Sequence, residues 1–467
     1  MEIPPWLRSS AAVEHRGAGS KCRRFCARGR LLLATLRASR AAVERSMYHP
    51  RVSSPSRLRL DPGAWLIFAI LVLDVAGIGL IIPVLPYYAT AYGAGGLAVG
   101  LLFSSYSIAQ FLSTPFLGAL SDRHGRRPVL LLSQFGAACA YLLLGLAGSL
   151  EMLFLARIIG GITAGNASTA QAYLADRTPE EARTKSYALL GAAFGIGFLI
   201  GPAAGGVLSQ VHPRLPAFAA AAVALTSLLT AWRFLPESLP PERRGRARRS
   251  LNPLAVLARY AWRPGLRNLL WANFLLNVAF SGLQTNFAVW ASRRFGFGPR
   301  ETATAFVDLA LTALVVQGLV IRRVAGHVPD RILAIAGFGL TALGFAAVVL
   351  APVVPALYTG LAVLAAGAAL GQAPLTSLQT SQVDAIEQGA LSGAGQALAS
   401  LARIFGPLWA GALYSWLTPD MPYWSGAALL VLGALVLWPS ARGSLSPAWE
   451  TGDHEFLSSP AARKRSR

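Results

Sequence analysis

Charged residues are scarce in this chain of 467 residues, and their scarcity argues against a soluble globular fold. Only 13% of the residues are Asp, Glu, Lys or Arg, whereas 54% are hydrophobic. A soluble domain carries about 25% charged residues, because it needs them to cover its surface. Cysteine is also rare, and Cys22, Cys26 and Cys139 provide no disulfide framework.

Enzyme motifs are missing as well. The chain has no Walker loop, so ATP drive is unsupported, and no nucleophile motif surrounds His124 or His327. We therefore expect neither an enzyme nor a cofactor, and no metal site.

What the chain does have is long apolar blocks of about 20 residues, the length at which a helix crosses a hydrocarbon core of roughly 30 Å. We identify twelve: 64–86, 97–120, 128–149, 152–174, 186–209, 216–236, 268–290, 301–321, 331–350, 353–374, 390–416 and 422–439. Helices are expected, because each one satisfies its own backbone hydrogen bonds in lipid. A β-barrel would instead show short alternating segments. The sequence predicts an all-α membrane protein with twelve transmembrane helices.

The basic residues give this protein an orientation. The net charge of +21 does not indicate nucleic-acid binding, because the charges lie in alternate loops. If the N-terminus is cytoplasmic, seventeen basic residues fall in cytoplasmic loops and four in external ones, Arg214, Arg293, Arg294 and Arg300. This positive-inside bias predicts a multi-pass protein of the inner (plasma) membrane with both termini in the cytoplasm. Loop 291–300 departs from the trend.

Composition breaks divide the chain into five parts. Residues 1–60 are Arg-rich and predict a disordered tail, for which Met47 is an alternative start; a transit peptide or lipid-binding arm is the other interpretation. An N-terminal six-helix half follows at 61–236, a Pro-, Arg- and Glu-rich cytoplasmic linker at 237–267, and a C-terminal six-helix half at 268–439. The polar stretch 440–467 predicts a second disordered tail.

An internal repeat supports the two halves. Gly201-Pro202 recurs as Gly406-Pro407, Gly118 as Gly318, and Gly165-Asn166 as Gly371-Gln372. The offsets are 205, 200 and 206 residues, and each links one block to the block six places later. Related halves around a midplane site are a recurring design of transporters.

A short loop after the second block carries a glycine and several charges. It reads Gly118-Ala119-Leu120-Ser121-Asp122-Arg123-His124-Gly125-Arg126-Arg127. Gly125 supplies conformational freedom for a tight reversal, and Asp122 is expected at a helix N-terminus, where the dipole favours a carboxylate. The arginines would bridge to acids on neighbouring helices in one conformation and release them in another. We predict a gating loop formed by Gly118, Asp122, Arg123, Gly125, Arg126 and Arg127.

Glycines form small faces on two blocks. In block four Arg157, Gly161 and Gly165 recur every four residues, and block five does the same with glycines, which favours close helix packing. The predicted hinge or seam comprises Gly197, Gly201, Pro202, Gly205 and Gly206. Such a seam would slide or bend between inward-open and outward-open states.

Few charges lie within the membrane blocks, and a charge at the bilayer centre costs about 2.5–3.5 kcal/mol. Asp74 lies ten residues into block one, about 15 Å deep at 1.5 Å per residue. We predict that it pairs with Arg157 and is protonated and released during a transport cycle; a purely structural ion pair is the alternative. Asp308 is a second carboxylate candidate, with Arg403 as a conjectural partner.

Polar side chains at membrane depth are the candidates for a substrate cavity. Asn166 and Gln284 are preferred, with Gln110 and Tyr106 added as cavity-wall candidates. Others occur at similar depth: Gln134, Gln171, Asn273, Asn277 and Gln317.

The gating loop resembles the signature of the major facilitator superfamily. The run from Leu73 to Pro86, Leu-Asp-Val-Ala-Gly-Ile-Gly-Leu-Ile-Ile-Pro-Val-Leu-Pro, resembles the first helix of the tetracycline/proton antiporters. Ala172–Asp176, Gly197–Gly206 with its Gly-Pro-Ala-Ala-Gly-Gly run, and Leu235–Ser238 resemble that family too. The resemblance covers the first half throughout and the second half mainly at 317–323 and 388–411. It implies the major facilitator fold and drug export in exchange for protons, with Asp74 as a coupling carboxylate.

One departure bears on the substrate. The tetracycline antiporters carry an intramembrane aspartate on the third helix, where this chain has Gly136-Ala137-Ala138-Cys139-Ala140-Tyr141. We therefore expect proton-coupled efflux of small lipophilic molecules, with tetracycline as one possible substrate, by a monomer whose partners are substrate, protons and lipid. The alternatives are a proton-coupled metabolite or nutrient transporter of the same fold, and a non-transporting membrane receptor.

Overall fold

The structure is a computed structural model that describes residues 62–178, 183–245, 257–258, 260–263, 265–324, 326–383 and 387–438. By internal contacts the chain divides into residues 1–59 and 60–467, and the fold below belongs to the second unit. The predicted tails, 1–60 with Met47 and 440–467, lie outside the described residues, as does part of the predicted linker.

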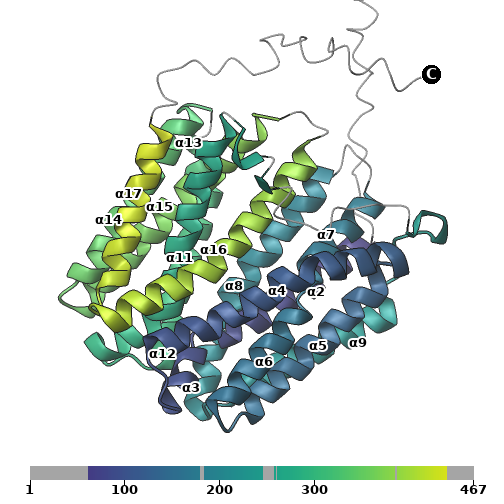
Figure 1. Cartoon of the computed structure of the whole chain (residues 1–467), viewed down its shortest axis with the longest axis horizontal. Coiled ribbons are helices and arrows are strands. Elements are labelled where there is room, and N and C mark those ends of the chain that lie inside the picture. The colour runs from purple at the N-terminus through teal and green to yellow at the C-terminus, as the bar shows by residue number, and fades with distance from the viewer. Residues whose placement is uncertain are drawn as a thin grey trace, which may run out of the picture. The chain divides into compact units, whose positions relative to one another are not determined.

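All regular elements among the described residues are helices (Figure 1). The first half contains α2 (Pro62–Ile81), α3 (Leu85–Ala91), α4 (Gly96–His124), α5 (Arg126–Leu146), α6 (Leu150–Ile162), α7 (Asn166–Arg177), α8 (Arg183–Val211) and α9 (Leu215–Phe234). A short 3-10 turn, η3 (Pro241–Arg243), follows. The second half contains α11 (Leu266–Phe295), α12 (Pro299–Val315), the π-helical turn η4 (Val316–Val320), α13 (Ile321–Val324), α14 (Asp330–Leu350), α15 (Val354–Thr380), α16 (Gln388–Trp416) and α17 (Met421–Leu437).

These helices match the twelve predicted blocks. Ten helical stretches among the described residues are long and apolar enough to cross a membrane, and α17 is a shorter apolar helix. The twelfth, α11, is 30 residues long. It carries more polar residues than its neighbours, and these are tolerated because most of its surface is buried against α16 and α17. The prediction of twelve helices in two halves is confirmed.

Local sequence explains where the helices start and break. Proline lies in the first turn of α9, α12, α15 and α17, where its missing N–H costs nothing. Two predicted blocks are each split into two helices. Pro83 interrupts the first block between α2 and α3, and Gly165 interrupts the fourth between α6 and α7. The second break places Asn166 at the start of α7.

The packing of the first half is repeated in the second. In the first half α2 packs on α8, α5 on α9, and α4 on α6; in the second α11 packs on α16, α14 on α17, and α12 on α15. Each pair therefore recurs six membrane-spanning blocks later, as the glycine repeat predicts. Gly201 of α8 faces Gly79 of α2, and Gly406 of α16 faces Gly282 of α11 in the same manner.

Candidate functional site

The first half contains a buried carboxyl group, Asp74 on α2. Its Oδ1 accepts a hydrogen bond of 2.6 Å from Nε2 of Gln134 on α5, and its Oδ2 is buried without a hydrogen-bond partner. Gln134 is itself fully buried. The side chain of Asn166 on α7 also interacts with this carboxyl. Neutral amides, and no positive charge, thus hold Asp74 in place.

Asp74 lines a small, partly enclosed cavity formed by α2, α4, α5, α6, α7 and α9. A space of ≈ 50 Å³ is open there to the centres of water-sized molecules. Pockets for drug-sized ligands measure about 300–1,000 Å³, so this cavity is too small for such a ligand. The polar residues that line it are Asp74, Tyr106, Ser133, Tyr141, Arg157, Thr163 and Asn166.

Arg157 on α6 reaches the same cavity but contacts aromatic rings. Its guanidinium carbon lies 4.2 Å from the centroid of the Tyr106 ring and 5.7 Å from that of Phe103. Such cation–π contacts offset part of the cost of burying a guanidinium. Among the described residues no ion pair joins Asp74 to Arg157, and Arg157 Nε is buried without a partner. The predicted direct pair is therefore absent from this conformation, although both side chains line one cavity.

The four residues predicted to line a substrate cavity do not all lie in one place in the structure. Asn166 and Tyr106 line the Asp74 cavity. Gln110 of α4 lies with its Nε2 3.5 Å from the Ala164 carbonyl, at the break between α6 and α7, where it ties two helices together. Gln284 is half-buried on α11. The sequence did not single out Gln134; only the packing of α5 on the first-half helices reveals it as the partner of Asp74.

The second carboxylate candidate, Asp308 on α12, lies outside that cavity. It is half-buried, and its Oδ2 is buried without a hydrogen-bond partner. Arg403, its suggested partner, bonds instead to Ser400 of its own helix, with Nη2 3.2 Å from Oγ. Among the described residues neither side chain has an ion-pair partner, so the Asp308–Arg403 pair is absent from this conformation.

A cluster of amides occupies the second half near the positions that the repeat equates with Asp74 and Asn166. Asn277 Nδ2 donates to Oδ1 of Asn273 at 2.9 Å, and Gln372 Nε2 lies 3.4 Å from the same oxygen. The acid Asp74 is thus matched by an amide, whereas Asn166 is matched by another amide, so the two halves differ in charge at related places. Among the described residues of this cluster, the buried carboxyl of the first half has no ionisable equivalent.

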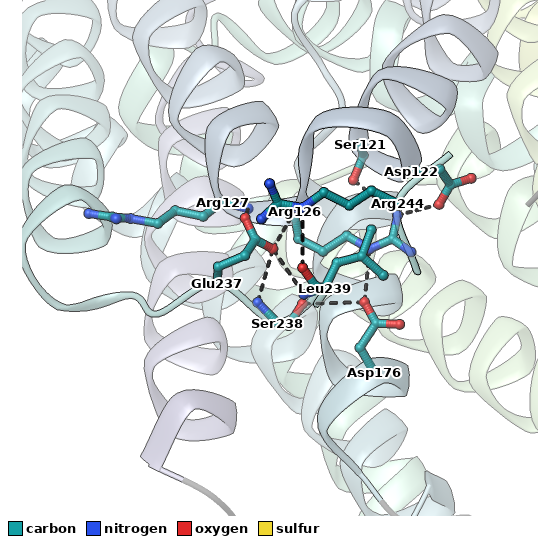
Figure 2. A network of polar contacts seen from close by, with 9 residues as sticks. All are labelled: Ser121, Asp122, Arg126, Arg127, Asp176, Glu237, Ser238, Leu239 and Arg244. Carbon is teal, nitrogen blue, oxygen red and sulfur yellow. Dashed lines mark hydrogen bonds and ion pairs between the residues drawn. The ribbon is translucent and has the colours of Figure 1, made fainter. Parts of the chain in front are cut away.

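The gating loop is held by an ionic network, drawn in Figure 2. Arg126 is buried; its Nη1 lies 2.5 Å from Asp122 Oδ1 and its Nε 2.9 Å from Asp176 Oδ2 on α7. Arg126 Nη1 also donates to Ser121 Oγ at 3.2 Å. The predicted bridge from a loop arginine to an acid on another helix is therefore formed. Removing one partner would leave a buried charge without compensation.

The carboxylate at the start of α5 belongs to Glu237, which follows α9, and not to Asp122 as predicted. Glu237 accepts hydrogen bonds from the backbone N–H groups of Arg126 and Arg127, at 2.8 and 3.2 Å (Figure 2). Asp122 lies instead in the last turn of α4. The helix dipole disfavours a negative charge there, and the ion pair with Arg126 offsets this cost.

Gly125 fits this arrangement for two reasons. Its φ is +109°, a conformation that side chains rarely adopt, and a Cβ there would collide with the Glu237 carboxylate. The conformational freedom predicted for Gly125 is therefore confirmed. Of the remaining loop residues, Arg127 donates to the Trp232 carbonyl at 2.5 Å, Arg123 is exposed, and Gly118 has open space around it.

The sequence profile of the Major Facilitator Superfamily matches residues 67–407. The chain belongs to the major facilitator superfamily. Its relatives are transporters and not enzymes, in agreement with the sequence.

Among the members of this superfamily, tetracycline resistance protein class C of Escherichia coli is 32% identical over 371 residues, which cover 78% of this chain and 92% of that protein. Major facilitator superfamily domain-containing protein 10 of Bos taurus is 35% identical over 377 residues, which cover 75% of this chain and 79% of that protein. The crystal structure of the human organic anion transporter MFSD10 (TETRAN) superimposes with a TM-score of 0.63 at 28% identity, covering 81% of this chain and all of that one. The resemblance to tetracycline resistance proteins is thus confirmed.

The predicted glycine seam of this superfamily member joins α8 to two neighbours. Gly197, Gly201 and Gly205 face α2, where a Cβ on Gly201 would lie 2.6 Å from the Ala76 carbonyl oxygen. Gly206 faces the other way, against Ala303 of α12 in the second half. Helix α8 therefore packs closely on both halves.

The two halves of the transporter meet at a region that we call the Tyr87 end: Tyr87, the first three turns of α4 and the second half of α16. The Tyr87 hydroxyl donates to the Phe297 carbonyl at 3.0 Å and lies 2.8 Å from Thr302 Oγ1. Ser104 Oγ donates to the Ile404 carbonyl at 2.7 Å, and Gly100 packs on the backbone of Pro407. These contacts close the Tyr87 end in this conformation, whereas Gly125 lies at the opposite end of α4.

Proposed function

We propose that this transporter exports small lipophilic molecules in exchange for protons, and that Asp74 carries the proton. The observation that supports the proposal is the burial of Asp74 in the first half, held by a neutral amide and with one oxygen unpartnered. A buried carboxylate is costly unless it is paired. An ionisable group inside a membrane therefore indicates a function, and a buried carboxyl can take up and release a proton.

Substrate binding is coupled to protonation of Asp74 through the charges around Tyr106. Asp74, Arg157 and Arg403 all lie within range of electrostatic interaction with the Tyr106 side chain, so charges from both halves meet near one ring. A cationic or strongly polar substrate is attracted while Asp74 is ionised. Protonation removes that attraction and favours release. Two unit charges about 10 Å apart interact by about 1.7 kcal/mol at an effective dielectric constant near 20, which is more than tenfold in affinity.

The orientation is part of the proposal. We place the Gly125 end and both termini in the cytoplasm of an inner-membrane protein, on the basis of the basic residues in alternate loops. The closed Tyr87 end then faces outward, and this conformation would receive substrate from the cytoplasm. The Asp122–Arg126–Asp176 network would rearrange as the other state forms. We further propose a monomer driven by the proton gradient alone.

A vesicle experiment tests the exchange. Everted membrane vesicles containing the protein are given an inward-acidic pH gradient and a panel of fluorescent lipophilic compounds that includes tetracycline. We expect accumulation that collapses when an uncoupler is added and that is lost in Asp74→Asn. Glu151→Gln is the matched control, because Glu151 is exposed in the first turn of α6. Gradient-driven accumulation that is unchanged in Asp74→Asn would remove Asp74 from the coupling role.

A second candidate function, transport of organic anions, is favoured by the two arginines. Arg157 lies over the Tyr106 ring and Arg403 of the other half interacts with it electrostatically. Neither arginine has an acidic partner among the described residues. The human relative MFSD10 is an organic anion transporter. For an anionic substrate the effect of protonation is reversed, because protonating Asp74 strengthens anion binding. The anion and the proton would then cross the membrane in the same direction. Arg403→Gln should then abolish uptake of an anionic probe and leave uptake of a cationic one intact.

A further inference from the structure

Unpartnered polar atoms gather around the Asp74 cavity. Four side chains that line it have buried polar atoms without a hydrogen-bond partner: Asp74 Oδ2, Ser133 Oγ, Arg157 Nε and Asn166 Oδ1. They come from four different helices, α2, α5, α6 and α7. Most buried polar groups in proteins have at least one partner, so four unpartnered atoms around one small space need an explanation.

The chemistry of these atoms indicates what would join them. Arg157 Nε is only a donor, the ionised Asp74 oxygen and the Asn166 oxygen only accept, and the Ser133 hydroxyl does both. Water donates two hydrogen bonds and accepts two, so a few water molecules would satisfy all four atoms together. One water needs about 10–15 Å³ of the space open to its centre, and the cavity offers ≈ 50 Å³.

We propose that this cavity binds a small cluster of ordered water molecules that links the Asp74 carboxyl to the Arg157 guanidinium and serves as its proton path. This inference rests on the proposed role of Asp74 in proton coupling. A hydronium ion that enters the cluster transfers one proton to Asp74 Oδ2 and leaves a neutral water; the reverse transfer returns the proton. Arg157 stays protonated throughout, and its charge holds the water next to the carboxyl.

The other groups that face Asp74 are consistent with this path. The titratable side chains that share the cavity with it are Tyr106 on α4, Tyr141 on α5 and Arg157 on α6, while α7 and α9 contribute Asn166 and Ala224. Among the described residues no second carboxylate lines this cavity, so Asp74 is the group there that gains and loses the proton. The remaining walls are small or apolar residues, including Gly77, and the volume excludes a drug-sized substrate.

Gly77→Ala tests the water cluster, because the added methyl group would fill part of the volume that the water molecules occupy. A Cβ on Gly77 would lie 3.5 Å from Tyr141 Cε2, an ordinary contact, so the added methyl group fits and occupies part of the cavity. Gly191→Ala is the control, because its Cβ meets nothing within 4 Å. Protonation of Asp74 is followed in the purified full-length protein by time-resolved infrared spectroscopy after a pH jump, as the carboxyl band that Asp74→Asn lacks. Ser133→Ala provides a second variant that removes one water ligand without adding volume.

We expect Gly77→Ala and Ser133→Ala to slow protonation by roughly tenfold or more, because each proton transfer needs a hydrogen-bonded partner within about 3 Å. Binding of a transported compound should not change. Wild-type protonation rates in both variants would overturn the proposal, as would a high-resolution density map showing a dry cavity or a direct Asp74–Arg157 contact. Failure of the proposed function gives a different result: Asp74 would protonate through the cluster while no gradient-driven transport occurs.

Discussion

Replacing Gly201 by alanine should destabilise the contact between α2 and α8. The new Cβ would lie 2.6 Å from the Ala76 carbonyl oxygen and 2.7 Å from Gly79 Cα. Ordinary contact begins at 3.4 Å, so the helices must separate by several tenths of an ångström. Both contacting atoms belong to the backbone and cannot rotate away. Overpacking of this kind costs about 1–3 kcal/mol.

Gly195 of the same helix provides the control. A Cβ at Gly195 meets nothing within 4 Å, and alanine is favoured over glycine in a helix interior by about 0.5–1 kcal/mol. Gly195→Ala should therefore leave stability unchanged or raise it, whereas Gly201→Ala lowers it. The free energy of unfolding is measured in mixed detergent micelles through the fluorescence of the 11 tryptophans. Equal effects of the two substitutions, or a stabilised Gly201→Ala, would refute the assignment of the seam.

Two further predictions concern the two ends of the transporter. Tyr87→Phe removes the hydroxyl contacts with Phe297 and Thr302, and an interhelical hydrogen bond in a membrane is worth about 0.6 kcal/mol. Spin-label distances across the Tyr87 end should therefore show a larger open population. Glu237→Gln removes the negative charge at the start of α5 and should lower the free energy of unfolding by about 0.3–1 kcal/mol. Glu242→Gln, on an exposed residue, should not lower it. No difference between these two variants would contradict the role assigned to Glu237.

The fold could be predicted because its determinants are local. Blocks of apolar residues define membrane helices whatever their neighbours, and the glycine repeat relates the halves. The breaks at Pro83 and Gly165 were missed, since hydropathy averages over such a residue. Loop 291–300 departs from the charge trend because Arg293 and Arg294 have structural contacts: their guanidinium carbons lie 5.2 Å from the Tyr414 ring and 5.6 Å from the Trp290 ring.

The candidate site was predicted in part, and the limit is tertiary packing. Asp74 stands out as a charge in an apolar block, so the sequence identifies it. Its partner does not stand out, because several amides lie at membrane depth and only the packing places Gln134 next to it. The same holds for Glu237, which reaches the start of α5 from a segment about 110 residues away in the chain. A pattern in one helix cannot specify which helix will lie against it.

The most direct test of the central claim is to count protons when substrate binds. A transported compound is titrated into purified protein in weakly buffered solution, and the pH change is read with an indicator dye. Linkage requires that exchange at Asp74 releases about one proton per bound molecule near the pH at which the group titrates. We predict release by the wild type and none by Asp74→Asn. Proton uptake would support cotransport of an anion, and equal release by both proteins would contradict the role of Asp74.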